Sequence, residues 1–239
     1  MPMPAGDAVG SGARGSVSEG AVTMATMTAS ESPAASPRVG QVPHALSPRQ
    51  WAQQMLRPGR AVVCDVESTD FDGAILEIAV IDSATGAVLL DTLVDPGAVP
   101  IHPAAAAVHG ISADQLVGAP DWAAVHPKLV AVTAGKVALA YNAEFDMGRI
   151  LYDCHRYGLD PAHLADPRGW GCIMLARSQA EGVEKSIRLG AAHRARGDAE
   201  AARRVLQDIA DGRINPGPVE PQPTPSGCPD EVRAERVAR

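Results

Sequence analysis

The stretch Ala61-Val-Val-Cys-Asp-Val-Glu67 decides the fold of this chain. Its β-branched residues predict a short strand at residues 61–65, and apolar runs predict two more strands at 75–81 and 88–94. The sequence Asp82-Ser-Ala-Thr-Gly86 connects the second run to the third as a hairpin-type turn. We therefore expect three consecutive strands joined by short connections, which give the sheet an antiparallel start.

Helical periodicity dominates the rest of the folded part. Apolar residues at spacings of three and four predict helices at residues 121–133, 143–157 and 198–210. Val137–Ala140 predicts one further buried strand between the first two of these helices. Before the first strand, Ser47 and Gln50 form a capping box that begins another helix. This order of elements predicts an α/β fold in which helices flank a mixed sheet.

Composition divides the chain into three parts. All eight aromatic residues lie between Trp51 and Trp170, whereas 17 of residues 1–46 are Gly, Pro or Ser. The segment from Pro216 to Pro229 contains six prolines. Segments of this kind bury too little apolar surface to offset the entropy lost on ordering. We expect a disordered lead at 1–46, one domain at 47–212 and a disordered Pro-rich tail at 213–239.

Charge and hydropathy exclude several classes of protein. The formal net charge is −7, so nucleic acid is not held by broad charge attraction and any contact with it must be local. No segment approaches the roughly 18 consecutive apolar residues needed to cross a bilayer, which excludes an integral membrane protein. The N-terminus lacks the pattern of a secretory signal, so we expect a cytoplasmic protein. Its four scattered cysteines should then be reduced and structural.

Two carboxylates follow the first predicted strand. Asp65 and Glu67 are two residues apart, so their side chains share one face of the strand. Like charges at this distance repel, and their burial without a partner is costly. A divalent cation between them removes both penalties, and oxygen ligands suit Mg²⁺ or Mn²⁺. The alternative is a pair of acids that reaches solvent at the end of the strand.

A third carboxylate, Asp146, lies early in the helix that follows the strand at 137–140. Ligands usually bind an α/β sheet at the edge where strands end and helices begin. The alternative is an ordinary first-turn acid that interacts favourably with the helix dipole, a position that better suits the neighbouring Glu144.

The last helix adds Asp198, with His193 five residues before it. On one continuous helix these side chains would point about 140° apart, so His193 must lie on the preceding loop if both face one site. A histidine on a loop is a common general base. The alternatives are a solvent-exposed His193 and an Asp198 that acts as an N-cap.

Four motifs in this order resemble the DEDDh group of 3′→5′ exonucleases, the superfamily of the proofreading epsilon subunit of bacterial DNA polymerase III. The resemblance extends from Trp51 to Ile209. The motifs are Val63-Cys-Asp65-Val-Glu67-Ser-Thr69, His109-Gly-Ile111, Asn142-Ala-Glu-Phe-Asp146 and the third motif from His193 to Ala199. The resemblance implies a ribonuclease-H-like fold and a two-metal phosphodiester hydrolase that releases nucleoside 5′-monophosphates from a 3′ end.

The resemblance also implies roles for individual residues. The carboxylates that would hold two Mg²⁺ or Mn²⁺ ions are Asp65, Glu67, Asp146 and Asp198, and His193 would deprotonate the attacking water. The residues that would contact the 3′-terminal nucleotide are Ser68, Thr69, Asn142 and His109. The implied substrate is the 3′ end of single-stranded DNA or RNA, with a DNA polymerase or repair protein as a possible partner.

This chain departs from the family pattern in places. Asp70 replaces a common glycine, Arg196 replaces an apolar residue, and the segment from Leu175 to His193 is short. One alternative is therefore a nucleic-acid-binding or polymerase-associated module whose cleavage is weak or lost. A second alternative is an exonuclease that acts on short RNA. Five arginines near the third motif either meet phosphates or form an exposed helix face: Arg188, Arg194, Arg196, Arg203 and Arg204.

Overall fold

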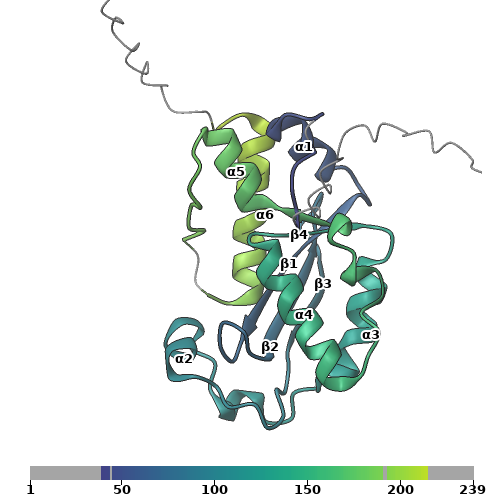
Figure 1. Ribbon diagram of the computed structural model, residues 1–239, viewed down its shortest axis with the longest axis vertical. Coiled ribbons are helices and arrows are strands. Elements are labelled where there is room, and N and C mark those ends of the chain that lie inside the picture. The colour runs from purple at the N-terminus through teal and green to yellow at the C-terminus, as the bar shows by residue number, and fades with distance from the viewer. Residues whose placement is uncertain (1–38, 44, 191–192, 215–239) are drawn as a thin grey trace, which may run out of the picture. The chain divides into compact units, whose positions relative to one another are not determined.

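The computed structural model describes residues 39–43, 45–190 and 193–214. Its centre is a five-stranded sheet with the order β3-β2-β1-β4-β5 (Figure 1). The strands are β1 (Ala61–Ser68), β2 (Ile75–Asp82), β3 (Val88–Leu93), β4 (Val137–Ala140) and β5 (Trp170–Cys172). Strands β1, β2 and β3 pair antiparallel, whereas β4 and β5 are added parallel to β1. The predicted mixed sheet with an antiparallel start is confirmed.

Six α-helices surround the sheet in the described part of the chain. They are α1 (Pro48–Met55), α2 (Pro103–His109), α3 (Trp122–Thr133), α4 (Ala143–Tyr157), α5 (Ile173–Glu181) and α6 (Ala195–Asp211). Short 3₁₀ turns lie at Ala113–Leu116, Ala162–Ala165 and Pro167–Gly169. The capping box predicted at Ser47 and Gln50 begins α1. None of the described helices is long and apolar enough to span a lipid bilayer.

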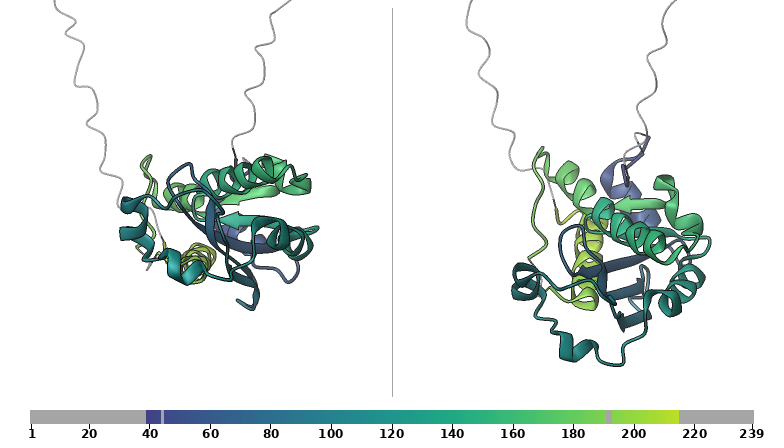
Figure 2. Two further views of the ribbon diagram at one scale, coloured as in Figure 1. Left: turned by 90° about the horizontal axis from the view of Figure 1, so that it is seen from below. Right: turned by 60° about the horizontal axis from the view of Figure 1, so that its bottom comes forward.

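The helices cover both faces of the sheet, as the left view of Figure 2 shows for α4 and α6. Alternation along β1 divides the core between the two faces. Val62 and Cys64 pack with residues of α3 and α4, whereas Ala61 and Val63 pack with residues of α1, α5 and α6. Odd-numbered residues of β1 therefore face α6, and this alternation continues to the end of the strand.

Four elements differ from the sequence prediction. Helix α5 is one of them, because no helix was predicted over residues 173–181. Helix α6 begins at Ala195, three residues before the predicted start, because the Ala195 amide finds an acceptor on β2, the Glu77 carboxylate. Strand β5 is only three residues long, which is too short to give a periodic pattern. Helix α2 is a run of alanines without periodicity, and the His102 side chain caps it by accepting from the Ala104 amide.

Part of the predicted lead packs against the fold. The carbonyl of Gly40 accepts a hydrogen bond from the Cys172 amide at 3.0 Å, and Val42 is only 5% exposed. The segment in contact with the folded unit therefore begins at or before Val39. The rest of the predicted lead and nearly all of the predicted tail lie outside the described residues. Three cysteines are buried and unbridged, namely Cys64, Cys154 and Cys172, while Cys228 lies outside the described residues.

Candidate active site

Three carboxylates meet between β1 and the start of α6. Asp65, Glu67 and Asp198 each offer one oxygen, and these oxygens lie within 4.8 Å of one another. The pleat of β1 turns Asp65 and Glu67 toward α6, and the first turn of α6 brings Asp198 against them. Asp198 is 8% exposed, and its Oδ1 is buried with no hydrogen-bond partner among the described residues.

Asp146 lies against this cluster from the other side of β1. It is buried in the first turn of α4, and its Oδ1 accepts a hydrogen bond from the Val66 amide at 3.1 Å. Val66 lies between the two acids of β1, so Asp146 is fixed to the strand at the level of the cluster. The neighbouring Glu144 is exposed, as expected for the solvent-facing acid of this turn.

Each of the four acids has a raised pKa, and burial is the largest cause for every one of them. Removal from water raises the pKa of Asp65 well above its usual value, and the charge of Asp146 adds to the shift. Burial raises the pKa of Asp146 to about 8. Burial, followed by the charges of Asp198 and Glu77, raises the pKa of Glu67 to about 7. Burial also raises the pKa of Asp198, and the nearby His193 opposes this shift.

These residues fit a divalent cation. The donors are all carboxylate oxygens, which hard cations such as Mg²⁺ and Mn²⁺ prefer. The unpartnered Oδ1 of Asp198 is a buried acceptor that such an ion would satisfy. Positive charge at this point would also lower the raised pKa values, because it favours the ionised carboxylates.

His193 lies on the connection just before α6, beside Asp198. Its backbone is left-handed, with φ of 52°, a conformation that is uncommon outside glycine. Its side chain is exposed, and it lines a cavity of about 460 Å³ together with Asp198, Tyr141 and residues 186–190. The Tyr141 hydroxyl donates to the Ile187 carbonyl at 2.6 Å and so holds one wall of this cavity in place.

Two of the predicted substrate residues lie in the turn after β1. Ser68 and Thr69 are both buried. The Thr69 hydroxyl accepts from the Ala74 amide, the Thr69 amide donates to the Ala74 carbonyl, and the Thr69 carbonyl accepts from His102. The Ser68 hydroxyl donates to the Asp70 carbonyl at 2.7 Å. The backbone amide and carbonyl of Thr69 therefore already have hydrogen-bond partners within the protein.

The other two predicted substrate residues come from α2 and α4. Asn142 is exposed and precedes α4, and its side chain makes no capping bond. His109 ends α2 and is 5% exposed, with Nδ1 accepting from the Ile111 amide at 2.9 Å. Its Nε2 is buried without a partner among the described residues. Burial lowers the pKa of His109, which favours the neutral ring.

The structure adds a residue that the sequence analysis missed. Glu77 lies in β2 directly opposite Glu67, and it is 5% exposed. It accepts hydrogen bonds from the Arg194 guanidinium and from the Ala195 amide. A single acid inside the apolar run Ala74-Ile-Leu-Glu-Ile-Ala-Val80 was the available signal, because a buried charge requires a partner.

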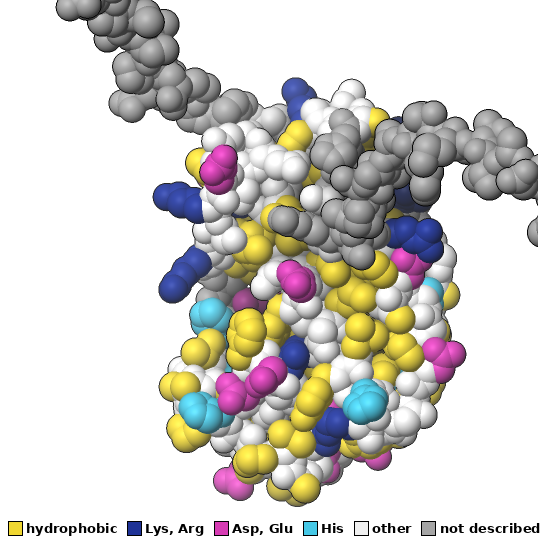
Figure 3. Space-filling view, viewed as in Figure 1, with side chains coloured by type: hydrophobic (Ala, Val, Ile, Leu, Met, Phe, Trp, Pro, Cys, Tyr) yellow, Lys and Arg dark blue, Asp and Glu magenta, His cyan; other side chains and the backbone are white. Residues whose placement is uncertain are grey.

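Two arginines near the third motif form ion pairs or hydrogen bonds with other residues of the chain. Arg196 pairs with Glu200 and Asp91, and Arg203 donates to the carbonyls of Ser83 and Ala84. On the face seen in Figure 3, Lys and Arg side chains are scattered singly among hydrophobic and acidic ones. This pattern agrees with the prediction that any contact with nucleic acid is local.

Comparison with known proteins assigns most of the described chain to a family. Residues 62–206 match the family described as Exonuclease, RNase_T. The chain belongs to this exonuclease family. It is therefore a nuclease enzyme, and the predicted family is confirmed.

Individual relatives are more distant. The chain is 35% identical over 113 residues to the "Uncharacterized exonuclease CP81" of Escherichia phage 186; this match covers 46% of this chain and 57% of the relative. The chain thus spans little more than half the length of this curated relative. Similar solved structures include the nuclease domain of 3'hExo, a DEDDh family member, bound to rAMP (16% identity, TM-score 0.46, covering 65% of this chain and 94% of that chain). Another is Exonuclease X in complex with 5' overhanging duplex DNA (24% identity, TM-score 0.41, covering 63% of this chain and 91% of that chain).

Proposed function

We propose that this exonuclease hydrolyses single-stranded DNA from the 3′ end and releases nucleoside 5′-monophosphates. The observation that carries the proposal is the convergence of Asp65, Glu67 and Asp198, with a buried carboxylate oxygen left without a partner, in a chain of the exonuclease family. The domain proposed to perform the reaction is residues 47–212, against which Gly40 and Val42 also pack.

Two divalent ions are proposed to bind at this cluster. Asp65, Glu67, Asp146 and Asp198 would hold them, and their four negative charges match the charge of two divalent cations. Bound Mg²⁺ or Mn²⁺ would supply positive charge to the attacking and leaving oxygens of an in-line displacement at phosphorus. Asp146 has one oxygen committed to the Val66 amide, which leaves its other oxygen for this task.

His193 is the proposed general base. It is exposed at the cavity and stands beside Asp198, so its ring has access to solvent and to the acidic cluster. A histidine accepts a proton near neutral pH, which suits the activation of a water molecule for attack on phosphorus. Ser68, Asn142 and His109 remain the proposed contacts of the terminal nucleotide. Thr69 stays a prediction from the sequence; in this structure it is 0% exposed, and its amide and carbonyl already have hydrogen-bond partners.

The proposed substrate is a free single-stranded 3′ end, and a polymerase or repair protein is the proposed partner. The acidic net charge and scattered basic side chains favour capture of one strand end over binding along a duplex. A role in proofreading or repair of DNA follows from this substrate. A cytoplasmic location stays a prediction from the sequence.

The test uses the full chain with 5′-labelled single-stranded DNA and RNA of matched sequence, in Mg²⁺, in Mn²⁺ and in EDTA. We expect a ladder of labelled products that shorten by one nucleotide, which requires metal and is absent for Asp65→Asn. A 3′-phosphate on the same oligonucleotide should slow the reaction. Immediate release of labelled mononucleotide would instead show attack from the 5′ end.

The same experiment separates the alternatives. Faster degradation of RNA than of DNA would contradict the proposed substrate and favour the exonuclease on short RNA. No cleavage by a folded protein that still binds Mn²⁺ would contradict the enzymatic proposal and favour a nucleic-acid-binding module. Binding of Mn²⁺ is measured independently from the relaxation of water protons.

A further inference from the structure

Glu67 and Glu77 lie opposite each other on adjacent strands, and only Glu67 belongs to the cluster of three carboxylates. Glu67 on β1 and Glu77 on β2 are directly paired in the antiparallel register, so their side chains lie on the same face. Glu67 belongs to the cluster of three carboxylates, whereas Glu77 does not. A second buried acid at this distance from Glu67 is unfavourable unless other groups compensate its charge.

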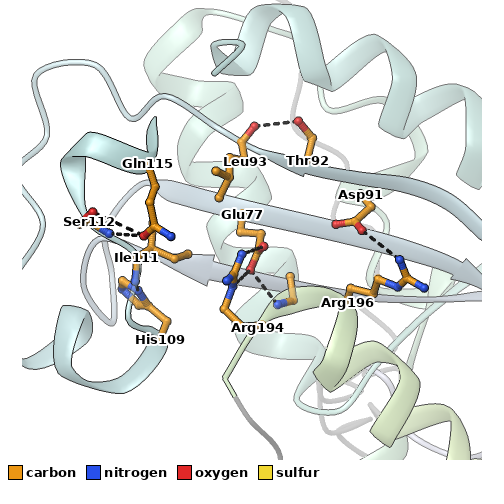
Figure 4. A network of polar contacts seen from close by, with 11 residues as sticks. Glu77, Asp91, Thr92, Leu93, His109, Ile111, Ser112, Gln115, Arg194 and Arg196 are labelled. Carbon is orange, nitrogen blue, oxygen red and sulfur yellow. Dashed lines mark hydrogen bonds and ion pairs between the residues drawn. The ribbon is translucent and has the colours of Figure 1, made fainter. Parts of the chain in front are cut away.

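All the groups that compensate Glu77 come from the start of α6, as Figure 4 shows. Arg194 donates from Nε to Oε2 at 2.9 Å and from Nη2 to Oε1 at 2.5 Å, which forms a bidentate pair. The Ala195 amide donates to Oε2 at 3.0 Å. Both carboxylate oxygens of Glu77 are therefore occupied by donors from this one segment.

These donors lie at a critical point of the chain. His193 immediately precedes Arg194 and has the left-handed backbone, and Asp198 follows in the first turn of α6. The Ala195 amide lies at the N-terminus of α6 and has no acceptor within the helix. The Glu77 carboxylate on β2 accepts its hydrogen bond and so caps α6. A left-handed backbone is unfavourable for a residue other than glycine, so it persists only where neighbouring contacts hold it.

We propose that Glu77 is a positioning residue of the exonuclease site. By holding Arg194 and Ala195 on β2, it fixes the backbone of His193 and the first turn of α6, so that His193 faces the cluster that Asp198 completes. The inference rests on the proposed function, in which His193 is the general base. It assigns Glu77 a role distinct from that of Glu67, because three donors engage its two oxygens and it is not one of the three acids whose oxygens lie within 4.8 Å of one another.

The test is Glu77→Gln in the full chain, which keeps the size of the side chain and removes its charge. At the Oε2 position the glutamine oxygen can still accept from Arg194 Nε and the Ala195 amide, but its NH₂ group at the Oε1 position sets a donor against Arg194 Nη2, so the bidentate pair is lost. We expect kcat to fall by about 10- to 100-fold, with KM and the affinity for Mn²⁺ unchanged. Exchange of the Ala195 amide with deuterium should become faster, because the donor–donor contact with Arg194 weakens the attachment of this segment to β2.

A double-mutant cycle with His193→Ala tests whether Glu77 acts through the histidine. If it does, Glu77→Gln should have little effect on kcat once His193 is absent. Asp91→Asn is the matched control. It disrupts the 3.7 Å contact between Asp91 of β3 and Arg196 of the same helical turn, and it should leave kcat unchanged. If Glu77→Gln does not fold, Arg194→Lys replaces it, because lysine keeps the charge and loses the bidentate geometry.

The outcomes separate this inference from the proposed function. A slow His193→Ala variant together with a fully active Glu77→Gln variant would overturn the positioning role and leave the general base in place. Equal losses from Glu77→Gln with and without His193 would also overturn it. A fully active His193→Ala variant would overturn the proposed general base itself. Loss of Mn²⁺ affinity in Glu77→Gln would show that Glu77 acts on the metal ligands instead.

Discussion

Glu67 and Glu77 are both glutamates and lie opposite each other on adjacent strands, but the charged groups around them differ. Glu77 has three hydrogen bonds from Arg194 and Ala195 that satisfy both of its oxygens. Glu67 is surrounded by other acids, and its pKa is raised to about 7. Two facing acids of one sheet therefore differ in their partners: Glu77 is bonded by nearby donors, whereas Glu67, the acid proposed to bind metal, has mainly acids around it.

Helix α4 repeats the same contrast two turns apart. Asp146 and Asp153 are both buried, and each accepts a hydrogen bond from a strand amide, that of Val66 or of Ile75. Asp153 also pairs with Arg156, whereas Asp146 has other carboxylates nearby. Asp153 is therefore a structural residue that fixes α4 to the start of β2, and Asp146 belongs to the acidic site.

The largest expected effect is the loss of activity in Glu67→Gln. Removal of this carboxylate should lower the rate by at least about 10⁴-fold, because it removes an acid proposed to hold metal. The same change should stabilise the metal-free protein at pH 8. A folded-state pKa above the unfolded value means that stability falls as pH rises from about 4.5 through 7, and glutamine removes this loss.

Glu77→Gln is the comparison for that stability measurement. It should lower the free energy of unfolding, because it breaks the bidentate pair with Arg194 and sets an amide donor against the guanidinium. Thermal unfolding of both variants at pH 5 and pH 8 checks the contrast. Destabilisation of the metal-free protein by Glu67→Gln at pH 8 would mean that Glu67 has a structural partner in solution.

The second prediction concerns His193→Ala. Without the proposed base, the rate should fall by about 10²–10⁴-fold, while the affinity for Mn²⁺ stays unchanged. The side chain is exposed, so the variant should fold normally. Rates at saturating substrate between pH 6 and pH 9 provide the measurement. An unchanged rate would show that another group activates the water.

Metal binding should stabilise the protein in a pH-dependent way. Protons compete with metal for carboxylates of raised pKa, so the shift in Tm on addition of Mn²⁺ should be larger at pH 8 than at pH 6. At a concentration of about 100 times Kd, the shift should be about 5–10 °C. Differential scanning fluorimetry measures it, with Asp65→Asn as the control. An equal shift at both pH values would argue against binding through these acids.

The smallest effect is expected at the outer contact of α6. Arg196 is 54% exposed and lies 3.7 Å from Asp91, so solvent screens this pair. Arg196→Ala should change the free energy of unfolding by less than about 0.5 kcal/mol and leave the rate unchanged. A large loss of activity would instead place Arg196 on the path of the substrate phosphates.

The sequence predicted the elements that have strong local signals. Three antiparallel strands, the helix at Ala143–Tyr157 and the capping box of α1 follow from patterns of a few neighbouring residues. The sequence also placed Asp65 and Glu67 on one face, because alternation along a strand is a local property. It missed β5 and α2, since three residues and a run of alanines give no periodic signal, and it also missed the nine-residue helix α5.

Local patterns in the sequence thus predicted most of the strands and helices, and the motifs on them indicated the family of exonucleases. Only the tertiary structure decided which acids are free. Glu77 reads in the sequence as one acid in an apolar strand, and Arg194 as one of several arginines near a helix. Their pairing across 117 positions of the chain depends on the packing of α6 against β2. Local patterns set the backbone of each element, whereas the charge that surrounds a carboxylate comes from elements that are distant in sequence.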